Sequence, residues 1–575
     1  MERTADCQSP KMSTILADRQ RRKSREYRVS NRSCYKNLDA IAPTKDTPKY
    51  QSINQGGGMQ MKRLFAVAFV LFSSFFGGAA FAQAPEAQVE SGHLRGIVEN
   101  GVLVFRNIPF AAPPIGPLRW RAPQAALAWE GVRAAEAYGP ACPQPDRTDG
   151  GGGGRASVQS EDCLQLNIWA PEGARDLPVM LWIHGGAHQI GSAVFPIYDG
   201  GALAKQGLVV VTANYRLGPL GYFAHPALTK EAGPEDPLGN YGFLDQIAAL
   251  EWVQRNITAF GGDKSNVTLF GESAGGASSI YLMASTKTKG LFHRAIIQSG
   301  GGLQQPTRLA FQEQQGLLLA QAAGLSAEAS AGELRALTTQ ALLDSQGPLR
   351  GAGFGPFVDG RAVTEAPWRA FADGRAQNVP LMLGWNDHEA SVLLALGVTG
   401  DAANALGGER NQELRSLYGD ISQEEFARRA LGDAFFGTPA VWMAQAQAKQ
   451  APTYLYHFTY ILERRRGSVP GASHGSEIPF IFQTWDKLLG ANLSALANIG
   501  AVLSEQDRQF STMISSCWAS FAKTGAPSCA GGPEWQAYDP KTDQLMLFAP
   551  DSAVRAVPNR PQYDLMVDWF FKTAR

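Results

Sequence analysis

Cysteine is scarce in this sequence, and its spacing excludes a common kind of metal site. Six cysteines occur among 575 residues, with no Cys-x-x-Cys pair and no histidine pattern beside them. A zinc site built on thiolates is therefore not expected. Four cysteines lie beyond residue 82 and form two pairs that are close in sequence, Cys142 with Cys163 and Cys517 with Cys529. An even number of cysteines in an oxidising compartment predicts two disulfides.

Long apolar runs are also missing after residue 82, so nothing there predicts a membrane span. The one apolar stretch lies earlier, where Lys62 and Arg63 precede the run from Leu64 to Phe76 and small residues end in Ala80-Phe81-Ala82. This is the layout of a secretory signal peptide cleaved after Ala82. The alternative is an uncleaved anchor, for which the apolar core is short. Residues 59–82 therefore predict a secreted or periplasmic protein.

Residues 1–58 lie before that signal and show no apolar periodicity. They hold 12 Lys or Arg against 6 Asp or Glu. Such a polar, basic segment fits neither a targeting sequence nor a packed domain. We interpret it as a non-native or disordered upstream extension, with the natural protein beginning at Met59 or Met61.

Excess positive charge is absent from the rest of the chain. Residues 83–575 contain 38 Lys or Arg against 46 Asp or Glu, a net charge of −8. That sign argues against nucleic acid or an anionic membrane as a partner, and we expect a small molecule instead. No internal repeat and no long linker divides this part of the chain. We predict a single domain over residues 83–575.

Short apolar runs alternate with helical patterns along that domain. This rhythm is typical of an α/β protein with a mainly parallel sheet covered by helices on both faces. Two helix-rich stretches, Leu309–Gln346 and Asn404–Gln450, interrupt the rhythm and form either the walls of a pocket or packing layers. The expected strands are 179–183, 208–212, 267–270, 295–298 and 381–383. One expected helix places Phe243, Ile247, Leu250, Val253 and Ile257 on a single face, which we interpret as core packing.

A candidate nucleophile follows the expected strand 267–270. Gly271-Glu272-Ser273-Ala274-Gly275 matches G-x-S-x-G, and a helical pattern begins directly after it. In that strand–turn–helix context the glycines allow a nucleophile elbow, which exposes the serine at the end of the sheet. A serine hydroxyl also needs a base and an electrophile within reach.

A candidate oxyanion loop lies upstream, directly after the strand 179–183. It reads His184-Gly185-Gly186-Ala187, and backbone N–H groups in such a loop can stabilise a developing oxyanion. We predict the N–H groups of Gly186, Ala187 and Ala274 as donors. The alternative is an ordinary glycine turn after a strand.

The candidate base and acid come later in the chain, in the order serine, acid, histidine that this fold uses. His293 lies too soon after Ser273, and His457 lies inside a strand-like run. His474 lies in the loop Gly471–Gly475, where a mobile base can reach a nucleophile. For the acid, Glu389 and Asp387 both follow the strand 381–383, and spacing alone does not decide between them.

Several runs together make the chain similar to the type-B carboxylesterases, the family of cholinesterases and bacterial para-nitrobenzyl esterases. The likeness extends from about Val89 to the C-terminus. The runs are IPFAAPPIGPLRWRAPQ at 108–124, SEDCLQLNIWAP at 160–171, YDGGALA at 198–204, NYRLGPLGYF at 214–223, GNYGFLDQIAALEWVQRNITAFGGDKSNVTLFGESAGG at 239–276, GWNDHEASVLL at 384–394 and GASHGSEIPFIF at 471–482.

The resemblance implies an α/β-hydrolase fold with helical insertions around the active-site gorge, and it assigns roles to particular residues. Its acid falls on Glu389 rather than Asp387, and its base falls on His474. In the family, the cysteine at the position of Cys163 forms a disulfide with an upstream cysteine, which Cys142 resembles. Ser299 matches a position that supports the acid, although a buried core serine explains it nearly as well.

The chain departs from the family pattern at two places. The oxyanion run has Ala187 where many relatives have a third glycine. Alanine keeps the backbone donor but narrows the part of the site that accepts the acyl group of the ester. The acid loop contains His388, an insertion in the familiar Asp-Glu-Gly run, so Glu389 is the least secure member of the predicted triad.

The function implied is a secreted serine carboxylesterase with a Ser273-His474-Glu389 triad, an acyl-enzyme intermediate and no metal or organic cofactor. Alternatives are the same triad acting on lactone, amide or thioester bonds, or a cholinesterase-like binding protein without activity. Just before the His474 loop, Arg464, Arg465 and Arg466 either bind a carboxylate on a charged ester or form a solvated turn.

Overall fold

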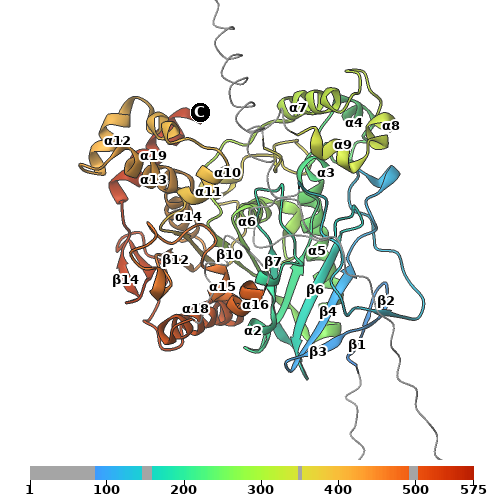
Figure 1. Cartoon of the computed structure of the whole chain (residues 1–575), viewed down its shortest axis with the longest axis horizontal. Coiled ribbons are helices and arrows are strands. Elements are labelled where there is room, and N and C mark those ends of the chain that lie inside the picture. Colours follow the sequence, from blue (N-terminus) through green and yellow to red (C-terminus); the bar gives the residue numbers. More distant parts are fainter. Residues whose placement is uncertain (1–83, 146–157, 347–352, 491–502, 575) are drawn as a thin grey trace, which may run out of the picture. The chain divides into compact units, whose positions relative to one another are not determined.

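An eleven-stranded sheet is the central element of this computed structural model, which describes residues 84–145, 158–346, 353–490 and 503–574 (Figure 1). The sheet has the order β14-β13-β12-β11-β10-β9-β7-β8-β6-β4-β3. Its strands are β3 (Ile97–Glu99), β4 (Val102–Pro109), β6 (Gln165–Pro171), β7 (Leu177–Ile183), β8 (Val209–Ala213), β9 (Gly262–Glu272), β10 (Arg294–Gln298), β11 (Leu381–Asn386), β12 (Thr453–Phe458), β13 (Gln544–Phe548) and β14 (Ala553–Ala556). The predicted upstream extension at 1–58 and signal peptide at 59–82 lie outside the described residues.

The middle of the sheet is parallel and its edges are antiparallel. From β8 through β7, β9, β10, β11 and β12 to β13, each strand pairs in parallel with the next. The outer strands β6, β4 and β3 on one side and β14 on the other pair antiparallel. The five strands expected from the sequence are β7 to β11, so the predicted mainly parallel sheet is confirmed. A separate small sheet joins β1 (Glu86–Val89), β2 (Gly92–Arg95) and β5 (Val132–Ala134).

Both faces of the sheet are covered, which explains why its central strands are apolar throughout rather than alternating. In β7, Val179, Leu181 and Ile183 belong to one buried cluster, whereas Met180 and Trp182 belong to another. The first cluster contains side chains of α5 (Tyr241–Asn256), α6 (Ala274–Ala284) and α14 (Thr438–Gln447), and the second contains side chains of α18 (Glu505–Thr524). The five apolar residues of the expected helix 243–257 are all buried in the first cluster, as predicted.

The two helix-rich stretches have different positions. The first contains α7 (Leu309–Ala322), α8 (Ala331–Ala336) and α9 (Thr339–Asp344), and none of its described residues lines the cavity next to Ser273. The second contains α12 (Asn411–Leu417), α13 (Gln423–Gly432) and α14, and α14 packs on β11 and β12. Between α13 and α14, Phe436 lies in a π-helical turn and lines the cavity. The second stretch therefore forms both a packing layer on the sheet and part of the cavity wall.

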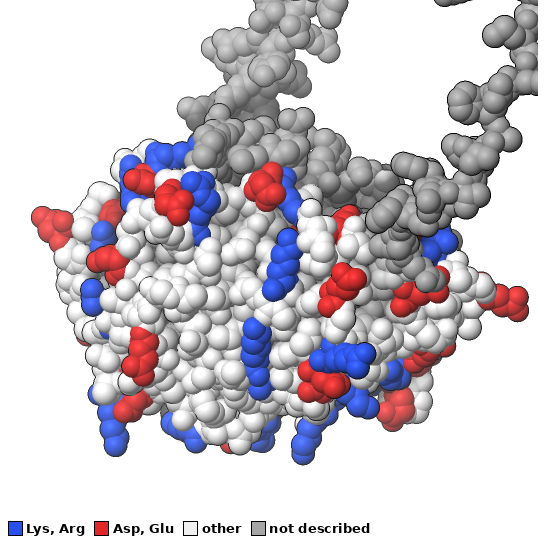
Figure 2. All heavy atoms as spheres, turned by 90° about the horizontal axis from the view of Figure 1, so that it is seen from below, with Lys and Arg blue, Asp and Glu red and all other residues white. Residues whose placement is uncertain are grey.

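Shorter helices connect these layers. They are α2 (Gly201–Ala204), α3 (Gly218–Gly221), α4 (Pro226–Glu231), α10 (Pro367–Ala372), α11 (Ala390–Ala395), α15 (Ile478–Ile481), α16 (Trp485–Gly490) and the C-terminal α19 (Arg560–Thr573). No helix among the described residues has the length and apolar character that a membrane crossing needs. On the face seen in Figure 2, the described acidic and basic side chains are interspersed, without a large patch of one sign.

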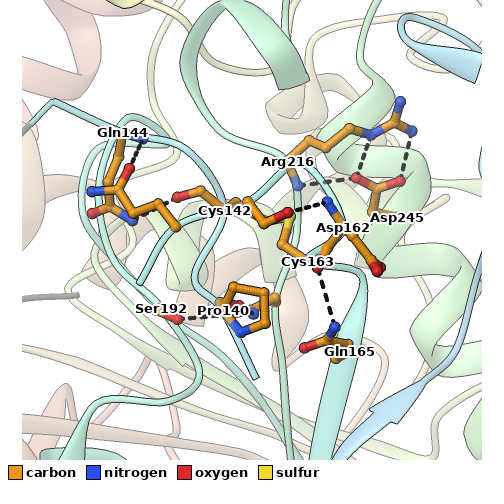
Figure 3. Close-up of a disulfide and its surroundings, with 12 residues drawn as sticks. Pro140, Cys142, Gln144, Asp162, Cys163, Gln165, Ser192, Arg216 and Asp245 are labelled. Carbon is orange, nitrogen blue, oxygen red and sulfur yellow. Dashed lines mark hydrogen bonds and ion pairs between the residues drawn. A yellow bond between two sulfur atoms is a disulfide. The ribbon is translucent and has the colours of Figure 1, made fainter. Parts of the chain in front are cut away.

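The structure contains both predicted disulfides, Cys142–Cys163 and Cys517–Cys529. Beside the first, Gln144 donates from Nε2 to the carbonyl of Gly191 (2.8 Å) and accepts from its N–H (2.9 Å). In Figure 3 Gln144 lies next to Cys142, and its Nε2 also donates to the Cys142 carbonyl (3.0 Å). This disulfide therefore anchors the segment that follows the candidate oxyanion loop.

Removing the Cys142–Cys163 bridge is expected to destabilise the fold. The double variant Cys142→Ser with Cys163→Ser should lose about 2–4 kcal/mol in free energy of unfolding, because the open chain gains conformational freedom. Urea unfolding followed by tryptophan fluorescence measures the loss. The same change at Cys517 and Cys529 should cost less, because that bridge spans 12 residues rather than 21. An unfolding free energy equal to that of the parent would contradict this role.

Candidate active site

Ser273 occupies a sharp turn between β9 and α6. Its backbone has φ 56° and ψ −122°, a conformation that residues with a Cβ rarely adopt. The Ser273 N–H donates to the carbonyl of Gln298 at the end of β10 (2.9 Å), and α6 begins at Ala274. The turn therefore places the serine at the carboxyl end of a central parallel strand, as expected for a nucleophile elbow.

The two glycines of the motif are required by close backbone approach. A Cβ added to Gly275 would lie 1.9 Å from the carbonyl oxygen of Ile183, and one added to Gly271 would lie 2.5 Å from the carbonyl carbon of Gly275. Both distances are far below van der Waals contact. Any larger residue at either position would force β9, α6 and the end of β7 apart.

The candidate oxyanion loop packs directly against the serine. A Cβ on Gly185 would lie 3.1 Å from Ser273 Cβ. Gly186 and Ala187 adopt φ 104° and 54°, and both line the same cavity as Ser273. Within the described residues, the N–H groups of Gly186, Ala187 and Ala274 donate no hydrogen bond, so all three are available as donors.

His474 and Glu389 are in direct contact. The Nδ1 atom of His474 lies 2.5 Å from Glu389 Oε2; the Glu389 side chain is buried and that of His474 is 9% exposed. The other oxygen of Glu389 accepts from Ser299 Oγ (2.5 Å) and from the N–H of Asn386 (2.7 Å). Asp387, the alternative acid, is exposed and forms no contact with His474 among those described. The structure thus brings Glu389 and Ser299 to the histidine, and not Asp387.

The loop that carries His474 is attached to the end of β11. The N–H of His388 donates to the carbonyl of Ala472 (2.8 Å), and Asn386 Nδ2 donates to the carbonyl of Ser473 (2.9 Å). The N–H of His474 itself donates to Ser391 Oγ (3.0 Å). The inserted His388 therefore takes part in joining the acid loop to the base loop.

Two buried glutamates that the sequence analysis did not single out complete the surroundings of His474. Its Nε2 atom lies 3.0 Å from Glu272 Oε1, and no hydrogen bond joins Nε2 to Ser273 Oγ in the described chain. Glu477 accepts from Gln298 Nε2 (2.9 Å) and Asn386 Nδ2 (2.6 Å). The sequence did contain a signal for Glu272. This glutamate stands at the end of the apolar strand 267–270, where burying a carboxylate has a high desolvation cost.

These carboxylates control the protonation of the histidine. Burial disfavours the imidazolium, but the nearby Glu272 and Glu389 outweigh burial and raise the pKa of His474 above its usual range. Burial also raises the pKa of Glu272, while His474 opposes that change. The site therefore stabilises a positively charged imidazole, the form that arises when His474 accepts a proton.

Replacing Glu272 with glutamine is expected to move the acid limb of the pH–activity profile. A base must be neutral to accept a proton, so with His474 as the candidate base we expect activity to fall as the pH drops through the pKa of this residue. Removing a carboxylate 3.0 Å from Nε2 lowers that pKa, and the acid limb should move by about one pH unit or more to lower pH. The pH dependence of kcat/KM measures this shift of the acid limb. An acid limb that stays in place or moves to higher pH would show that Glu272 does not control the base.

A cavity of about 500 Å³ opens over Ser273 and His474. Its walls are mainly aliphatic and aromatic, which suits the apolar parts of an organic substrate. Among the three arginines of the predicted charged triplet, Arg465 lines this cavity, whereas Arg464 and Arg466 do not. The apolar lining includes Ile190, Val392, Leu393, Leu396, Phe436, Ile461, Leu462, Val469, Phe480 and Trp485. No group of three or more His, Cys, Asp or Glu in the described residues is arranged as a metal site.

A mainly parallel sheet with helices on both faces, and a serine on a strand–turn–helix elbow beside a glycine loop, define an α/β-hydrolase. Comparison with known proteins gives the family. The sequence model of the Carboxylesterase family matches residues 83–420 and 418–566.

Relatives and solved structures agree with that match. The chain is 37% identical to a para-nitrobenzyl esterase of Bacillus subtilis, covering 82% of this chain and 95% of that protein. It is 36% identical to a fumonisin B1 esterase of Sphingopyxis macrogoltabida, covering 80% and 85%. A crystal structure of a Geobacillus stearothermophilus carboxylesterase superposes with a TM-score of 0.72 at 32% identity, covering 84% and 99%. The chain belongs to the carboxylesterase family and is a carboxylic ester hydrolase, as the sequence resemblance implied.

Proposed function

We propose that this chain is a secreted serine esterase that hydrolyses carboxylic esters through Ser273, His474 and Glu389 by way of an acyl-enzyme. The observation that carries the proposal is the pair His474 Nδ1 to Glu389 Oε2, 2.5 Å apart, in which His474 lines the same cavity as Ser273. A histidine oriented by a carboxylate, beside a serine that lines the same cavity, is the arrangement that activates a hydroxyl nucleophile.

In the first half of the reaction, Ser273 Oγ attacks the ester carbonyl carbon and His474 Nε2 accepts the hydroxyl proton. Glu389 holds the imidazole through Nδ1 and stabilises its charged form. The negative charge on the carbonyl oxygen is stabilised by the N–H groups of Gly186, Ala187 and Ala274. The C–O bond of the ester then breaks, and His474 returns the proton to the leaving alcohol.

In the second half, water replaces the alcohol. His474 Nε2 accepts a proton from the water as its oxygen attacks the acyl carbon, and the bond to Ser273 Oγ breaks. The proton passes to Ser273, which releases the carboxylic acid. In the free enzyme Nε2 faces Glu272, so the hydrogen bond to Ser273 Oγ forms only as substrate binds, a tightening that is common in hydrolases.

The division of the acyl group between water and methanol tests whether an acyl-enzyme intermediate forms. Phenyl butyrate and 4-nitrophenyl butyrate, hydrolysed in the presence of methanol, should give the same ratio of methyl butyrate to butyrate, because both pass through one butyryl-enzyme. Gas chromatography measures the two products. Ratios that differ between the two leaving groups would exclude a common acyl-enzyme.

Secretion is supported by the signal-like segment at 59–82 and by two disulfides, which persist in oxidising compartments. Mass spectrometry of the protein from the periplasm or medium of a producing bacterium should find Gln83 as its first residue. A protein that retains residues before Gln83 in the cytoplasm would contradict export.

A further inference from the structure

One arginine of the triplet Arg464–Arg466 differs from its neighbours. Arg465 is half-buried and lines the active-site cavity, whereas Arg464 and Arg466 are exposed. Its backbone is fixed by a helical turn, because its N–H donates to the carbonyl of Leu462 (2.7 Å) and its own carbonyl accepts from Ser468 Oγ (2.7 Å). The backbone of Arg465 is therefore held in place beside the cavity.

Among the residues that the structure describes, the guanidinium of Arg465 has no partner. No hydrogen bond, ion pair or ring contact joins it to another side chain in the described parts of the chain, whereas Arg466 donates to the carbonyl of Ile461 and stacks over Tyr460. By contrast, the half-buried Arg428 is paired with Glu425 (2.7 Å). An unpaired cation in a partly desolvated position is costly unless a ligand supplies the opposite charge.

The surroundings of Arg465 favour an anion. The other charged side chains that line the cavity, Glu272 and His474, contact each other (3.0 Å). Near Arg465 the wall is made of Ile461, Leu462 and Val469, which are apolar. A guanidinium forms two parallel hydrogen bonds with a carboxylate, and an apolar wall strengthens that pair by excluding water.

We propose that the site selects esters that carry a free carboxylate away from the scissile bond, such as monoesters of dicarboxylic acids, and that Arg465 binds this carboxylate. The inference rests on the proposed function, because it places the anion in the cavity over Ser273. Arg465 then determines specificity and takes no part in bond breaking.

Matched substrates test the inference. The probes are monoethyl esters of dicarboxylic acids of increasing chain length, each paired with the analogue in which a neutral amide replaces the carboxylate. At the preferred length the parent enzyme should favour the carboxylate. Arg465→Gln should raise KM for that carboxylate at least about tenfold with little change in kcat, because one charge-assisted contact is lost. The KM for the amide analogue should change far less.

Two further variants separate a specific contact from general charge or folding effects. Arg464→Gln removes the same charge one residue away, outside the cavity, and should leave the preference for the carboxylate intact. Arg465→Lys should recover part of the preference, because a cation without the planar fork still attracts a carboxylate. Equal effects of Arg464→Gln and Arg465→Gln, or a carboxylate preference that survives Arg465→Gln, would overturn the inference. A parent enzyme that hydrolyses neither series would instead count against the proposed function.

Discussion

Replacing Ser273 with alanine is expected to lower kcat/KM for ester hydrolysis by about 10⁴-fold or more. The variant retains the Cβ and the elbow but loses the oxygen that attacks the carbonyl, so no acyl-enzyme can form. The oxyanion donors remain and leave a small residual rate over water. Initial rates with a 4-nitrophenyl ester, followed by absorbance, measure the loss.

The matched control is Ser285→Ala, at the other end of α6 and outside the cavity. It should keep nearly the full rate, and Ser273→Ala should unfold at nearly the same urea concentration as the parent. A Ser273→Ala enzyme that keeps more than about one per cent of the parent rate would exclude Ser273 as the nucleophile.

Replacing Glu389 with glutamine is expected to lower kcat by about 10³–10⁴-fold. The Glu389 carboxylate accepts from Ser299 Oγ, from the N–H of Asn386 and from His474. A glutamine that keeps its oxygen toward the first two donors turns its amide N–H₂ toward Nδ1. The imidazole must then carry its proton on Nε2, where it cannot accept a proton from Ser273.

The neighbouring Asp387 gives the matched control for Glu389. Its side chain is exposed and makes no described contact with His474, so Asp387→Asn should stay within about threefold of the parent rate. Steady-state kinetics of the two variants decides between the two acids. A large loss in Asp387→Asn with a small one in Glu389→Gln would reverse the assignment.

The nucleophile elbow and the central strands could be predicted because their signals are local. Gly271 and Gly275 flank the serine in a strand–turn–helix unit, and such a unit leaves a short motif in the sequence, although the closest contact of Gly275 is with Ile183 of the neighbouring strand β7. Strands buried on both faces are short continuous apolar runs, and β7 to β11 therefore appear directly in the sequence.

Other parts of the site depend on which strands lie side by side. Glu272 and His474 are 202 positions apart, yet their side chains are 3.0 Å apart because the His474 loop is joined to the end of β11, and β9, β10 and β11 are neighbours in the sheet. Spacing left Glu389 and Asp387 equivalent, because both follow the same strand and only the path of the His474 loop distinguishes them. For the same reason the triplet Arg464–Arg466 could not be separated into one cavity residue and two exposed ones.

The central claim, that Ser273 is the activated nucleophile of an ester hydrolase, is tested most directly by a fluorophosphonate probe and mass spectrometry of the folded active enzyme. We expect one phosphonyl group per chain, on Ser273 Oγ, with loss of activity in proportion to labelling and no labelling of Ser273→Ala. Labelling of a different residue, or full activity after exposure to the probe without any label on Ser273, would contradict the assignment.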